Sequence, residues 1–164
     1  MPINMYNPFP PTPQIGFIVH DLTASQLGFY LTNNLNQYKN PNINIAVFAE
    51  TITPHCLLPQ FACFNISEAW GFSGILIATS LVSAQRLLTY TYCQDKYFYV
   101  WDLEWQRGSS RPNAFYRSVY NSIKLIARND YHKAAIENCW NNKVVGCTEN
   151  FNLEQMVKII TNGN

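Results

Sequence analysis

The chain has 164 residues and a formal net charge of +1, and only 13% of its residues are charged. This near-neutral balance, with no block of basic residues, excludes electrostatic capture of nucleic acid as a default function. Hydrophobic residues make up 48% of the chain and aromatic residues 15%, which excludes intrinsic disorder and suits one domain with a sizeable core. Because so few charges remain to solvate the surface, we expect part of it to face other protein subunits.

The first 14 residues, MPINMYNPFPPTPQ, form a proline-rich segment that lacks the basic and apolar regions of a signal peptide. Proline at this density favours extended chain of the polyproline type. We therefore expect an extended arm over residues 1–14, as a contact to other subunits, and a single domain over residues 15–164. The chain is not expected to be secreted.

Short apolar runs then alternate with helical patterns. We expect six strands, at residues 15–19, 43–49, 74–80, 97–101, 123–127 and 143–147. Helical spacing predicts helices within residues 22–38, 60–70, 81–88, 114–121, 129–141 and 152–161. The strands are continuous apolar runs, which is typical of strands covered on both faces of a parallel sheet. The prediction is a doubly wound, mostly parallel six-stranded α/β sheet with helices on both faces, of Rossmann-like type.

No apolar run is longer than a strand, so we expect no membrane span and no membrane partner. The five cysteines include no C-x-x-C pair, and we expect free thiols and no metal site. They are Cys56, Cys63, Cys93, Cys139 and Cys147.

Polar residues follow each predicted strand, at the edge where open parallel sheets bind ligands. His20 is a candidate general base, because imidazole titrates near neutral pH. Asp102 and Glu104 are separated by one residue, so in extended chain they would share a face and form a carboxylate pair. The remaining strand-end candidates for substrate binding are Thr79, Ser80, Arg128 and Glu149. The alternative is that such residues cap the helices that follow.

Phosphate-binding motifs are missing from the predicted strand ends. The first strand is followed by HDLTASQLG rather than G-x-G-x-x-G, and no P-loop occurs. We therefore expect no cofactor of the dinucleotide or nucleoside triphosphate kind.

The segment SEAWGFSGILIATSLVSAQRLL resembles the donor-site segment of GT-B glycosyltransferases. In that family a helix with two glutamates seven residues apart contacts the sugar nucleotide; Glu68 matches the second glutamate, while Gln60 stands at the first. The segments YFYVWDLEW and IKLIARNDYHKAAIENCWN resemble the acceptor half of the same family. Short proteins with a YVWDLEW block also look like glycosyltransferase-like proteins of tailed phages of marine cyanobacteria.

The resemblance leaves two hypotheses open. The first is a non-catalytic assembly protein with a glycosyltransferase-like fold, located in the cytoplasm of a host cell or in a virion. The second is a glycosyltransferase, or the acceptor half of one, that a partner or a dimer completes. There Asp102 or His20 would be the base, with a sugar nucleotide bound near Glu68. A complete enzyme of this type reacts in the cleft between two halves, and this chain has room for one.

Overall fold

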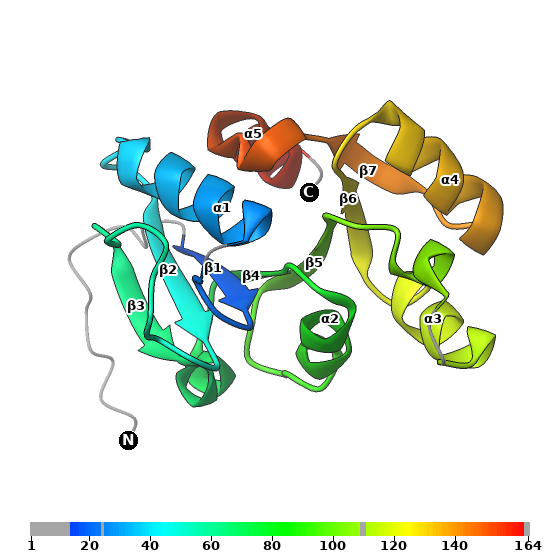
Figure 1. Ribbon diagram of the computed structural model, residues 1–164, viewed down its shortest axis with the longest axis horizontal. Coiled ribbons are helices and arrows are strands. Elements are labelled where there is room, and N and C mark those ends of the chain that lie inside the picture. Colours follow the sequence, from blue (N-terminus) through cyan, green and yellow to red (C-terminus); the bar gives the residue numbers. More distant parts are fainter. Residues whose placement is uncertain (1–13, 24, 109–110, 163–164) are drawn as a thin grey trace, which may run out of the picture.

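The computed structural model describes residues 14–23, 25–108 and 111–162, so the predicted arm lies almost wholly outside the described part (Figure 1). Seven strands form one sheet, and every neighbouring pair is parallel, in the order β3-β2-β1-β4-β5-β6-β7. The strands are β1 (Gln14–Val19), β2 (Asn44–Ala49), β3 (Ala62–Asn65), β4 (Ile75–Ala78), β5 (Asp95–Val100), β6 (Lys124–Ala127) and β7 (Val144–Cys147).

Helices cover both faces of this sheet (Figure 1). One face carries α1 and α5, and the other carries η1, α2, α3 and α4. The α-helices are α1 (Gln26–Gln37), α2 (Leu81–Leu88), α3 (Asn113–Tyr120), α4 (Asp130–Trp140) and α5 (Leu153–Asn162). Three short 3₁₀ helices are η1 (Ile66–Gly71), η2 (Glu104–Arg107) and η3 (Glu149–Phe151). The predicted doubly wound, Rossmann-like α/β fold is confirmed, and the sheet is parallel throughout its described strands.

Strand β5 shows why the apolar runs are continuous. Tyr97 and Tyr99 pack into the core under α1 and α5, whereas Phe98 and Val100 pack into the core under α2 and α3. All four side chains are buried, so neither face of the strand has a place for a polar residue. The hydroxyl of Tyr99 donates to the carbonyl of Thr148 at 2.7 Å, which satisfies the polar atom inside the core.

The predicted helix over residues 60–70 is wrong. The chain there forms strand β3 and then η1, so the sheet has seven strands rather than six. Within the described part of the chain, strand β3 lies at the edge of the sheet and pairs with β2 alone, and its side chains are mostly exposed. Residues 61–64, FACF, are a short apolar run, and a run of this length fits part of a helix as well as a strand; only its pairing with β2 distinguishes the two. Asn65 then caps η1 through the backbone N–H of Ser67.

The order of the strands creates a switch point between β1 and β4. Strand β1 leads through α1 to β2, on one face of the sheet, whereas α2 follows β4 on the other face. Open parallel sheets bind ligands beyond the carboxyl ends of strands at such a point. None of the helices in the described part of the chain is both long and apolar enough to cross a membrane.

Candidate functional site

A histidine, a glutamate and an arginine form a connected chain at the carboxyl edge of the sheet. His20 follows β1 and Glu50 follows the neighbouring parallel strand β2, so the two side chains lie side by side. Nδ1 of His20 lies 2.8 Å from Oε2 of Glu50. Nη1 of Arg86, on α2, donates to Oε1 of the same carboxylate at 2.6 Å. Three elements therefore converge on Glu50.

The charges and hydrogen bonds around Glu50 keep its carboxyl group ionised. Burial raises the pKa of Glu50, but the hydrogen bond from His20 and the charge of Arg86 together outweigh it, so the pKa lies below its ordinary value. In the tautomer whose Nδ1 donates to Glu50, Nε2 of His20 is the acceptor nitrogen, and it lies 3.8 Å from Oδ2 of Asp21. The His20 side chain is 72% exposed, so a ligand in solvent has access to the ring.

Asp21 lies beside His20 but serves its own loop. Its Oδ1 accepts hydrogen bonds from the backbone N–H of Thr23 at 2.9 Å and from the Thr23 hydroxyl at 2.6 Å. The hydrogen bond from that hydroxyl is the main reason that the pKa of Asp21 lies below its ordinary value. Two residues further on, the Ser25 hydroxyl accepts from the backbone N–H of Gly28 and caps α1.

Thr79 and Ser80, two predicted substrate-binding residues, hold the start of α2. The buried Thr79 hydroxyl donates to the carbonyl of Ile18 at 2.9 Å and so ties β4 to β1. The backbone N–H groups of Thr79 and Ser80 both donate to the hydroxyl of Ser83, at 3.2 and 3.0 Å. The Ser80 hydroxyl accepts from the backbone N–H of Ser83, which confirms the predicted cap.

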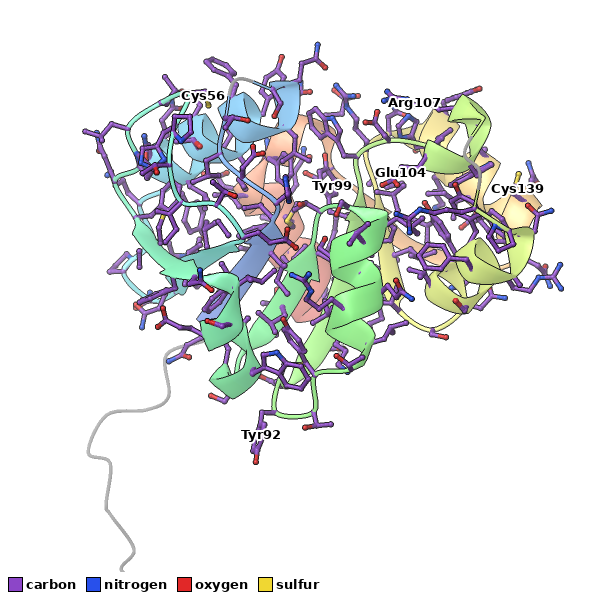
Figure 2. All side chains as sticks on the ribbon, turned by 60° about the horizontal axis from the view of Figure 1, so that its bottom comes forward. Cys56, Tyr92, Tyr99, Glu104, Arg107 and Cys139 are labelled. Atoms are coloured by element: carbon purple, nitrogen blue, oxygen red, sulfur yellow. The ribbon has the colours of Figure 1, made fainter. Side chains whose placement is uncertain are left out.

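The two acids after β5 have separate partners. Oε1 of Glu104 accepts the backbone N–H of Leu81 at 3.0 Å, so a side chain from η2 also caps α2. Oδ1 of Asp102 accepts from Nη2 of Arg107 at 2.8 Å. Figure 2 shows Glu104 and Arg107 on the same side of the molecule, near the start of α2. The expected carboxylate pair requires extended chain, but the chain turns into η2 at Glu104.

The remaining predicted residues also have local roles. The guanidinium of Arg128 lies 3.9 Å from the centre of the Trp101 ring and donates to Oδ1 of Asn150 at 3.5 Å. Glu149 is exposed in the first turn of η3. Oε1 of Glu68 accepts the backbone N–H of Asn65 at 3.3 Å and completes the capping box of η1. Each of these three side chains is thus explained by a cation–π contact, a cap or simple exposure.

Sequence reasoning did not select Glu50 and Arg86 as site residues. Glu50 has a signal, because it is the first polar residue after the second predicted strand and therefore lies beside His20 in a parallel sheet. Arg86 has none, because the side chain leaves the end of α2 and reaches Glu50 only in the folded molecule.

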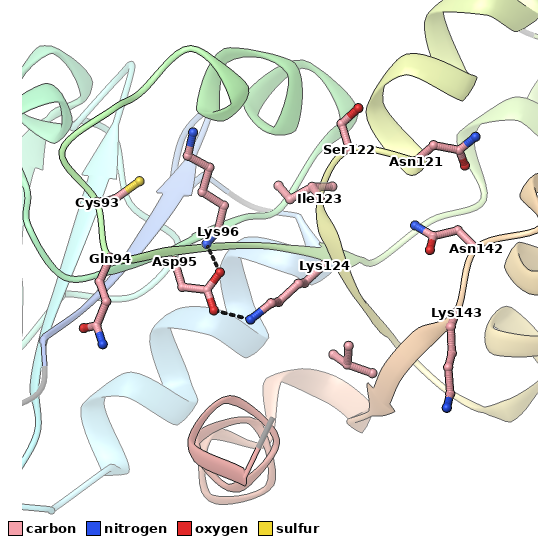
Figure 3. A pocket seen from close by; sticks show the side chains of 11 residues that line it. Cys93, Gln94, Asp95, Lys96, Asn121, Ser122, Ile123, Lys124, Asn142 and Lys143 are labelled. Atoms are coloured by element: carbon pink, nitrogen blue, oxygen red, sulfur yellow. Dashed lines mark hydrogen bonds and ion pairs between the residues drawn. The ribbon is translucent and has the colours of Figure 1, made fainter. Parts of the chain in front are cut away.

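A second polar region lies at the opposite, amino-terminal edge of the sheet (Figure 3). A cavity of about 560 Å³ opens there between the starts of β5, β6 and β7. Nζ of Lys124 lies 2.5 Å from Oδ2 of Asp95, and Nζ of Lys96 donates to the carbonyl of Leu88 at 3.2 Å. Burial raises the pKa of the Cys93 thiol at its wall, so the thiol stays protonated and is a poor nucleophile.

All five cysteines are free, and no group of three or more potential metal ligands comes together within residues 14–23, 25–108 and 111–162. Comparison with known proteins identifies no relative. No family model, no curated protein and no solved structure matches the chain.

Proposed function

We propose that this chain is a non-catalytic assembly protein, a Rossmann-like domain that associates with further copies of itself. The observation that carries the proposal is the use of the strand-end polar groups. Thr79, Ser80 and Glu104 hold the start of α2, and Asp21 holds the loop after β1. Groups that stabilise the fold in this way are poorly available to a substrate.

Exposed aromatic side chains support the same proposal. Phe64 on β3, Trp70 on η1 and Tyr92 in the loop before β5 are 39%, 50% and 75% exposed. Figure 2 shows Tyr92 at the end of the molecule away from Glu104 and Arg107, projecting from the loop. Aromatic residues are enriched in protein interfaces, and Trp and Tyr are enriched among the few residues that dominate the binding energy.

Sedimentation velocity of the full chain tests the proposal. The expected result is a species larger than one chain, whose fraction rises with concentration. Tyr92→Ser should weaken the association about tenfold or more, because a buried aromatic anchor is lost. Tyr131→Ser is the matched control. Tyr131 is 69% exposed but lies on α4, which packs on β6 and β7, at the other end of the sheet from β3. Its loss should leave the strength of the association unchanged. A single chain at every concentration would contradict self-association.

The likeness to small glycosyltransferase-like proteins of tailed phages supports a virion as the location of this assembly. Mass spectrometry of purified particles from a phage that encodes the chain tests this extension. We expect the chain in the particle at a stoichiometry that matches the oligomer in solution. Detection of the chain in the lysate but not in the purified particles would contradict a location in the virion.

A second candidate function is that of a sugar-nucleotide-dependent glycosyltransferase, or of its acceptor half completed by a partner. The exposed His20 ring, oriented by Glu50 and Arg86, supports this candidate because the arrangement suits a general base. Calorimetry with UDP-, GDP- and ADP-sugars tests it. Binding that His20→Asn weakens while Tyr131→Ser leaves it unchanged would favour the enzyme, and heat from no member of the panel would reject it.

A further inference from the structure

An apolar groove lies over β2 and β3, at the amino-terminal end of β1. Its floor comes from Ala46 and Ala62, which lie side by side on neighbouring strands. Phe48 and Phe64 are paired in the same register and stack with their ring centres 5.7 Å apart. Phe72 closes the other side, with its ring edge-on to Phe48 at 5.2 Å. The cavity between these rings has a volume of about 400 Å³.

Two glycines allow the Phe48 and Phe72 rings of the groove to lie close to the backbone. A Cβ on Gly16 would lie 3.1 Å from the Phe72 ring and 2.8 Å from the Phe48 ring. A Cβ on Gly74 would lie 2.8 Å from the Phe72 ring. Both rings therefore rest directly on the backbone, and the groove keeps its depth because nothing larger than hydrogen stands at either position.

The chemistry of the groove fits an extended, proline-rich peptide. The described residues that line it include no charged group; besides the three rings they are small, aliphatic or amide side chains. Aromatic-lined grooves bind polyproline-type segments, whose preformed shape lowers the entropy cost of binding. Gln14 and Asn44 stand at the amino-terminal end of the groove, where their amide groups suit the free carbonyls of such a segment.

The chain itself contains a segment of this composition, and the segment begins at the groove. The described part starts at Gln14, one of the residues that line the cavity. Residues 1–13 precede it and contain five prolines and Phe9. Proline has no N–H to donate, so this segment is a poor candidate for strand addition to β3 and a good one for a groove.

We propose that residues 1–13 of one copy bind in the groove of a second copy. This inference rests on the self-association proposed above and adds a second contact to the one at Tyr92. Pro10, Pro11 and Pro13 stand immediately before Gln14, and proline restricts both its own backbone and that of the residue before it. Proline at this density favours extended chain over a close reversal into the groove beside its own strand. In extended form its 13 residues span about 40 Å, enough to reach a neighbouring copy.

Photo-crosslinking of the full chain tests the inference. A benzophenone amino acid replaces Phe9 in an isotopically light chain, which is mixed with a heavy chain of native sequence. After irradiation we expect light-to-heavy crosslinks on peptides that contain Phe64 or Phe72. Phe64→Ser in the heavy chain should lower their yield about tenfold, and Tyr131→Ser should leave it unchanged.

The outcomes separate this inference from the proposed function. Crosslinks confined to one chain, or crosslinks between chains away from the groove, would overturn the inference. If sedimentation still shows an oligomer in that case, self-association stands and only this contact is wrong. A sample that stays a single chain at every concentration overturns both.

Discussion

Glu104 shows how a side chain that suggests chemistry in the sequence can serve a neighbouring helix. Its carboxylate accepts the backbone N–H of Leu81 and lies at the positive end of the dipole of α2. We expect Glu104→Ala to lower the free energy of unfolding by about 1 kcal/mol, and Glu104→Gln to lower it less, because an amide oxygen still accepts the bond. Urea unfolding measures both changes. Glu149→Ala is the control, since Glu149 is exposed; equal effects at the two positions would contradict the cap.

His132 makes stability depend on pH near neutrality. Burial lowers the pKa of His132 below its ordinary value, although the carbonyl of Val100 and the charge of Asp102 act in the other direction. The unfolded chain then binds the proton more readily than the folded chain, so stability falls as pH drops below about 6.5. We expect thermal unfolding to show this loss between about pH 7 and 5.5.

The variant His132→Gln isolates that effect. It should remove the loss of stability in this pH window, because glutamine does not titrate. Asp21 and Glu50 have lowered pKa values, so their contribution is present above about pH 4 and is lost only in stronger acid, in both proteins. An unchanged pH profile between about 7 and 5.5 in the variant would show that His132 is not the group responsible.

At the scale of elements, α5 packs on the edge strand β7 through a glycine. A Cβ on Gly146 would lie 2.7 Å from Cγ1 of Ile159. We expect Gly146→Ala to cost about 1–3 kcal/mol, because the added methyl group forces α5 away from the sheet. Gly71→Ala is the matched control, since a Cβ there meets no atom of the described residues within 4 Å. Chemical denaturation compares the two variants, and similar stabilities would mean that Ile159 moves aside freely.

Helix α4 shows what periodicity alone misses within an element. The helix forms where its spacing predicts it, and apolar residues at that spacing favour one buried face. In the structure Ile136 is fully buried, while Tyr131 is 69% exposed and Cys139 is also exposed. Trp140 packs against Tyr116 and Tyr120 of α3 at ring-centre distances of 5.9 and 5.4 Å. The helix therefore contacts its neighbour along a narrower stripe than the sequence indicates, because it covers the end of the sheet.

At the scale of the whole molecule, one sheet supplies both cores. Leu125 and Ile126 are adjacent on β6 but belong to opposite faces, one under α2 and α3, the other under α1 and α5. We expect Leu125→Ala and Ile126→Ala each to cost about 2–5 kcal/mol and to leave a single unfolding transition. Far-UV circular dichroism and tryptophan fluorescence should give the same midpoint for each variant. Separate midpoints would indicate that the two faces unfold independently.

Most of the architecture follows from the sequence, because burial on both faces leaves a local mark. The six continuous apolar runs all correspond to strands, and Ser80 caps the helix that follows it, one of the roles expected for it. Strand β3 escaped prediction because its short apolar run, residues 61–64, fits a helix as well as a strand, and its side chains are mostly exposed. The candidate site was predicted less well. His20 could be selected as a strand-end residue, but its link through Glu50 to Arg86 depends on where α2 packs on the sheet.

The sequence by itself determined the parallel α/β class, the approximate strand positions and the polar residues that follow the carboxyl ends of the strands. These features depend on local patterns: apolar runs, caps and the few residues that follow each strand. Only the tertiary structure decided what the polar residues do. Glu104 meets Leu81, Thr79 meets Ile18 and Glu50 meets Arg86 across 23 to 61 positions of chain. Hydrogen bonds over such separations are set by the order of strands in the sheet, which no local pattern encodes.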